Sequence, residues 1–161
     1  MTEEESNIEN LKKSYKKIKE KYSLPDFNEL NKEFSIEKIS EIETDFLIRE
    51  IRRYISEKFS NYLRFVELLL NPTNAPMFVF SITNKIQNED RKKLTDLYKR
   101  LSKIEVELIE LDLEYDDKRE AQFIIDAYNT WQEIKVELQY IVKVIKENWE
   151  NKNNNDRNYF G

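Results

Sequence analysis

The sequence predicts an all-α fold: an antiparallel up-and-down helical bundle of three long helices, with an N-terminal amphipathic helix and short connector helices. Apolar residues recur at spacings of three and four along most of the 161 residues, as they do on one face of a helix. The three prolines, at positions 25, 72 and 76, fall where this pattern breaks, and the single glycine is residue 161. Short connections make consecutive helices antiparallel neighbours, which favours the bundle.

The N-terminal segment predicts an amphipathic helix over about residues 3–22. Its apolar stripe spans only two heptads, so we expect the helix to pack on the rest of the chain or on a second copy rather than to form a coiled coil. The stripe consists of Ile8, Leu11, Tyr15, Ile18 and Tyr22. Pro25 ends this helix, and residues 23–43 predict a connector of short helices.

The pattern then predicts three long helices, over about residues 44–70, 88–115 and 118–149. Pro72 stops the first of them, and Asn88 is suited to cap the second. The polar residues after position 150 have no apolar period. We therefore divide the chain into an N-terminal helix (1–22), a bundle domain (23–150) and a disordered polar tail (151–161).

The composition excludes several kinds of chemistry. The chain has no Cys and no His, which removes disulfides, thiolate nucleophiles, the commonest metal ligand and the commonest general base. Without an interior glycine there is no phosphate-binding glycine loop. We therefore expect a non-enzymatic protein with no catalytic residue, no cofactor, no bound metal and no evident small-molecule substrate.

The N-terminus and the hydropathy pattern bear on location. The first ten residues are acidic and lack an apolar core, which argues against a targeting peptide. No apolar run approaches the roughly 18 residues that a membrane span requires. We expect a cytoplasmic protein that does not associate with membranes.

Three charged residues fall on apolar faces of the predicted long helices: Lys58, Glu105 and Asp112. An unpaired charge in such a position is costly, so we expect Lys58 to pair with Glu105 or Asp112 across facing helices. The alternative is that these carboxylates bind a cation, as in carboxylate metal-binding bundles. The di-metal bundles complete their sites with His, which this chain lacks.

The second long helix is divided by charge. Residues 91–103 carry six basic residues and one acid, whereas residues 105–117 carry seven acids and no base. A basic start and an acidic finish oppose the helix macrodipole. We therefore expect neighbouring segments or a partner to compensate these charges.

Two groups of basic residues are candidate nucleic-acid contacts. They are Lys12, Lys13, Lys16 and Lys17 in the N-terminal helix, and Arg49, Arg52 and Arg53 in the first long helix. The net charge of -5 and the pI of about 5.1 disfavour phosphate binding. A solvated helix face is the main interpretation, and a nucleic-acid accessory protein is the alternative.

Residues 72–82 are the best candidate for a functional surface, because their apolar side chains lie on every side of the predicted short helix and must be covered. They form either a core plug or a docking site, and Met and aromatic residues are enriched at interface cores. We expect an interaction or self-association module whose partner is another protein or a second copy. The candidate interface residues are Pro76, Met77, Phe78 and Phe80, with Leu11, Tyr15 and Ile18 of the N-terminal stripe.

Overall fold

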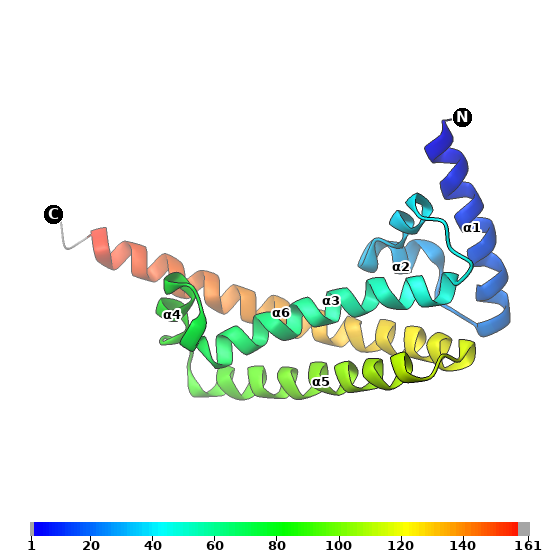
Figure 1. Cartoon of the computed structure of the whole chain (residues 1–161). Helices are drawn as coiled ribbons and strands as arrows, with labels where there is room; N and C mark the ends of the chain where they lie inside the picture. The colour runs from blue at the N-terminus through cyan, green and yellow to red at the C-terminus, as the bar shows by residue number, and fades with distance from the viewer. Residues whose placement is uncertain (1, 158–161) are drawn as a thin grey trace. The chain divides into compact units, whose positions relative to one another are not determined.

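The computed structural model describes residues 2–157, which are predominantly helical and contain no strand (Figure 1). The elements are α1 (Glu3–Tyr22), α2 (Phe27–Phe34), the 3-10 helix η1 (Ile36–Glu41), α3 (Leu47–Leu70), the 3-10 helix η2 (Pro72–Asn74), α4 (Met77–Thr83), α5 (Asn88–Leu113) and α6 (Asp117–Arg157). The predicted all-α class is confirmed, and α3, α5 and α6 are the three long helices. None of the described helices combines the length and the apolar character needed to cross a membrane.

The helix ends follow from local chemistry. Thr2 and Glu5 form a capping box at the start of α1: the Glu5 amide donates to Thr2 Oγ1 at 3.2 Å, and the Thr2 amide donates to Glu5 Oε2 at 2.8 Å. Ser23 ends α1 in the left-handed region, with φ of 57°, and Ser35 ends α2 in the same way. Glycine normally takes this position, and here serine takes it because the chain has no interior glycine.

Two boundaries differ from the sequence prediction. The helix predicted from residue 44 begins at Leu47, because the Thr44 hydroxyl accepts the Phe46 amide at 3.0 Å and forms a turn of its own. The tail predicted from residue 151 was wrong for residues 151–157, over which α6 continues to Arg157. A helix propagates one hydrogen bond at a time from its last turn and does not need a continuous apolar face to do so. Residues 158–161 of the predicted tail lie outside the described residues.

The chain divides into two compact units. Unit 1 comprises Met1–Ser60 and Ile104–Trp131, and unit 2 comprises Asn61–Lys103 and Gln132–Gly161. The helices α3, α5 and α6 contribute residues to both units. The predicted boundary between residues 22 and 23 stays a prediction, and α1 lies within unit 1.

Unit 1 is held together by an apolar core with an aromatic centre. Ring centroids lie 6.5 Å apart for Phe34 and Phe59, 6.2 Å for Phe34 and Trp131, and 5.7 Å for Phe59 and Trp131. These rings come from α2, α3 and α6, so they join three helices. The helix α1 packs on η1 and α2 and buries Leu11 and Tyr15 (Figure 1).

Unit 2 buries aliphatic side chains of α3, α5 and α6. They are Val66, Leu69, Leu94, Leu97, Leu101, Ile134, Leu138 and Ile141. Polar contacts between α5 and α6 lie beside this core: Arg100 donates to Glu133 at 2.8 Å, and the Tyr140 hydroxyl donates to Asp90 at 2.9 Å. The short helix α4 belongs to the same unit.

Candidate functional site

The helix α4 presents a surface of large apolar side chains in unit 2. Met77 is 89% exposed, Phe78 56% and Phe80 50%, and we call these three residues the α4 patch. Pro76 precedes the helix, and its carbonyl accepts the Val79 amide at 2.9 Å and the Phe80 amide at 3.2 Å. Contiguous apolar exposure of this kind commonly marks an interaction site.

The C-terminal end of α4 anchors the helix in unit 2. Ile82 and Thr83 are buried, and the Arg91 guanidinium donates to the Thr83 carbonyl at 3.1 Å. The Thr83 hydroxyl donates to the Phe80 carbonyl at 3.0 Å. The structure therefore divides residues 72–82: Ile82 belongs to the core, whereas the α4 patch is exposed, and the docking site stays a prediction.

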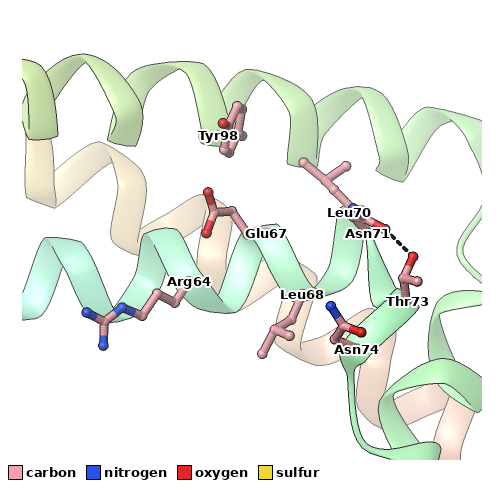
Figure 2. Close-up of a pocket in the computed structure, with 8 residues that line it drawn as sticks. All are labelled: Arg64, Glu67, Leu68, Leu70, Asn71, Thr73, Asn74 and Tyr98. Atoms are coloured by element: carbon pink, nitrogen blue, oxygen red, sulfur yellow. Dashed lines mark hydrogen bonds between the residues drawn. The ribbon is translucent and has the colours of Figure 1, made fainter.

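An open pocket of about 620 Å³ lies in the same unit, at the end of α3. Its lining residues are Arg64, Glu67, Leu68, Leu70, Asn71, Thr73, Asn74 and Tyr98. Figure 2 shows the Glu67 carboxylate directed toward Tyr98, and the Thr73 hydroxyl donating to Asn71 Oδ1 at 2.6 Å. The pocket combines apolar walls with polar groups at its edge, as peptide-binding and ligand-binding surfaces do.

The charges of the two units have opposite signs. Unit 2 contains thirteen basic and nine acidic residues, a formal net charge of +4. Unit 1 contains fourteen basic and twenty-three acidic residues, a formal net charge of -9. The α4 patch thus belongs to a basic unit of an acidic protein, and an acidic partner is attracted to that unit.

The predicted pairing of Lys58 with Glu105 or Asp112 was wrong. Lys58 donates to the Glu33 carbonyl, and its ammonium lies 4.5 Å from the Trp131 ring centroid. Glu105 accepts the Ser60 hydroxyl at 2.9 Å. The apolar period places each residue on the correct face of its own helix, but it does not determine which face of a neighbour lies opposite.

Asp112 pairs with Arg52, which also binds the buried Glu120. The Arg52 guanidinium donates to Asp112 at 2.7 Å and to Glu120 at 2.7 and 3.3 Å. Burial lowers the pKa of Arg52, but the hydrogen bonds to Glu120 and Asp112 outweigh it and raise this pKa. The bidentate pair joins α3 to α6, and both carboxylate oxygens of Glu120 accept hydrogen bonds from Arg52, which is typical of a structural ion pair.

Sequence reasoning did not identify Glu120 as a buried residue, although a signal for it exists. Glu120 lies four residues before Ile124 and eleven before Trp131, and both of these residues are buried. Arg52 likewise lies between Ile48 and Ile55 on the buried face of α3. Two opposite charges on buried stripes are the pattern that predicts such a pair.

The N-terminal stripe is not an exposed surface. Leu11 is 8% exposed and Tyr15 2%, because α1 packs on η1 and α2 within unit 1. The Tyr15 hydroxyl donates to the Pro25 carbonyl at 2.6 Å. Ile18 is half-buried and lines a small hollow with Phe46 and Tyr115. The prediction that Leu11 and Tyr15 contact a partner is therefore corrected: their own chain covers them.

The candidate nucleic-acid residues separate into two groups. Lys12, Lys13, Lys16 and Lys17 are exposed on α1. In α3, Arg52 is buried in its ion pairs, and Arg53 is paired with Glu50 at 2.9 Å and Glu57 at 2.7 Å. Arg49 lies 5.6 Å from the Tyr115 ring centroid. Burial therefore removes only Arg52 from the candidates, whereas Arg49, Arg53 and the lysines of α1 are exposed, as phosphate binding requires.

The chain is thus an all-α protein that exposes the apolar α4 patch in the same unit as an open pocket. Among the described residues, no group of three or more carboxylates is placed to hold a metal ion. No family model, curated protein or solved structure matches the chain. The function is therefore inferred from the exposure, contacts and charges of the described residues.

Proposed function

We propose that this chain is a non-enzymatic protein–protein interaction module and that the α4 patch is its binding surface. One observation carries the proposal: Met77, Phe78 and Phe80 are all at least half exposed on a seven-residue helix whose other end is anchored in the core. Covering apolar surface contributes about 25 cal/mol per Å², so a partner that buries these side chains is stabilised by them. Aromatic anchors in such a position are common energetic centres of interfaces.

The neighbouring pocket supports the same proposal. Leu68, Leu70 and Tyr98 line it on the α3 and α5 sides, and Asn74 lies three residues before Met77. Among the residues that the structure describes, Arg64 and Asn74 have no side-chain hydrogen bond, so both are available to a partner. An apolar patch bordered by available polar groups has the composition of an interface core with a polar rim.

Native mass spectrometry of the full chain, purified gently from its own cells, tests the proposal. We expect masses at multiples of 19.6 kDa or a reproducible added protein mass. The double variant Phe78→Ser/Phe80→Ser should lose these complexes and keep its helical circular dichroism. The matched control is Val136→Ser, which removes another exposed apolar side chain of unit 2.

Two results would contradict the proposal. The first is a wild-type spectrum with the bare monomer mass alone, and the second is a double variant that keeps its complexes. If the double variant instead loses its helical signal, Phe78 and Phe80 stabilise the fold and are not a binding surface.

A second candidate function is nucleic-acid binding through α1. The exposure of Lys12, Lys13, Lys16 and Lys17 on a single helix favours it. Binding through these lysines must weaken steeply as salt rises from low to moderate concentration, because counterions compete for the phosphates. Titration of a labelled DNA or RNA oligonucleotide at two salt concentrations tests it, and no binding at low salt would refute it.

A further inference from the structure

A second apolar surface is exposed on α5. Val106 is 65% exposed, Ile109 56% and Leu113 83%, and we call these residues the α5 stripe. Their spacing of three and four residues places them on one face of the helix. Exposed side chains at i, i+3 and i+7 are the anchors with which an amphipathic helix binds an apolar surface.

The charges around the α5 stripe are acidic. Residues 105–117 contain seven acids and no base, and the stripe lies in unit 1, whose net charge is -9. The α4 patch lies in unit 2, whose net charge is +4. The chain thus carries two uncovered apolar surfaces in surroundings of opposite charge.

We propose that the chain associates with a second copy of itself, the α4 patch of one copy packing on the α5 stripe of the other. This inference rests on the proposed function and names its partner. Burial of Phe78 and Phe80 against Ile109 and Leu113 supplies an apolar core, and the opposite net charges of the two units favour encounter in this orientation. Arg52 and Arg119 of the same chain pair with Asp112 and Glu110 near the acidic end of α5. Residues 105–117 still carry a net negative charge, which attracts a partner's basic unit.

The contact is heterologous, since it joins two different surfaces. Each copy carries both surfaces, so the contact either closes reciprocally into a pair or continues into longer assemblies. The attraction between the units also predicts that association weakens moderately as ionic strength rises through the physiological range.

Complementation between two variants tests the inference. The patch variant is Phe78→Ser/Phe80→Ser, and the stripe variant is Ile109→Ser/Leu113→Ser. In sedimentation equilibrium, each variant alone should associate at least tenfold more weakly than the wild-type chain. An equimolar mixture should form a one-to-one dimer, because the intact stripe of the first variant meets the intact patch of the second.

Matched controls separate a lost surface from a lost fold. All four substituted side chains are at least half exposed, so both variants should keep the wild-type circular dichroism. Val136→Ser, which removes an exposed apolar side chain from neither surface, should associate like the wild type.

Failure of the inference and failure of the proposed function give different results. If the patch variant loses association but the stripe variant keeps it, or if the mixture stays monomeric, the patch binds another surface, and only the inference is overturned. If the wild-type chain is monomeric at every concentration but the patch still captures another protein in native mass spectrometry, the inference is likewise overturned alone. If the patch variant associates like the wild type, both are overturned.

Discussion

The buried ion pair of Arg52 with Glu120 gives the sharpest stability prediction. The Glu120 side chain is fully buried, and the Arg52 side chain is 7% exposed. Glu120→Ala leaves the guanidinium buried without its bidentate partner, which costs about 3–5 kcal/mol of unfolding free energy. Domains of this size are stable by only about 5–15 kcal/mol, so the loss is a large fraction of the total.

Asp112→Ala is the matched control, because Asp112 binds the same guanidinium from a position exposed to water. Its side chain is 59% exposed, although its distance to Arg52, 2.7 Å, equals the shorter distance to Glu120. Solvent screens this pair, so its removal should cost about 1 kcal/mol or less. Comparing the unfolding free energies of the two variants shows whether the burial of the carboxylate or its distance from Arg52 determines how much each pair stabilises the fold.

Urea unfolding followed by far-ultraviolet circular dichroism measures both effects. With a slope of about 1–3 kcal/mol per molar urea, Glu120→Ala should lower the midpoint by about 1 M or more, and Asp112→Ala by much less. Replacing both charges, as Arg52→Met/Glu120→Leu, should cost less than the sum of the single variants, because no buried charge is left unpaired. Equal losses for Glu120→Ala and Asp112→Ala would refute the reasoning.

Two further predictions concern α1. Burial raises the pKa of Tyr15, and the nearby Asp26 and Glu29 raise it further, so folding favours the protonated phenol. This contribution is complete below pH 10, the ordinary tyrosine pKa, and is lost as the pH rises toward the folded pKa. The melting temperature of Tyr15→Phe should therefore fall less steeply with pH above pH 10 than that of the wild type. At neutral pH the variant should lose about 0.5–1.5 kcal/mol of unfolding free energy, because the hydrogen bond to Pro25 is missing. An equally steep fall in melting temperature for the variant and the wild type would contradict this. Thr2→Ala removes the capping box and should destabilise α1 by about 0.5–2 kcal/mol. Hydrogen exchange should then be faster for the backbone amides in the first turns of α1. Unchanged exchange there would show that packing alone stabilises the helix.

The sequence predicts the helices well because their signals are local. The period of apolar residues and the breaks at Pro25 and Pro72 predict α1 and the end of α3 at the residues where the structure has them. The helix α5 begins at Asn88, one residue earlier than a cap there implies, because the Gln87 carbonyl accepts the Arg91 amide at 3.0 Å. Such differences of one to three residues arise from turn chemistry that the apolar period does not report.

The candidate site is predicted only in part. The sequence marks residues 72–82 as apolar on every side, but it does not divide them into the anchored Ile82 and the exposed Met77. That division depends on which side of a short helix meets the core. Similarly, the stripe of α1 is recognisable from its spacing, whereas the burial of Leu11 and Tyr15 depends on η1 and α2 folding over it.

The sequence by itself determines the all-α class, the three long helices and the exclusion of cysteine and histidine chemistry, because these follow from composition and from neighbours within a few turns. Tertiary structure alone decides that Arg52 and not Lys58 pairs with Asp112, that α1 is covered by its own chain, and that the α4 patch stays exposed. The physical reason is the same in each case. A helical period determines the direction of a side chain from its own axis, whereas its partner depends on how separate helices are rotated and shifted against one another.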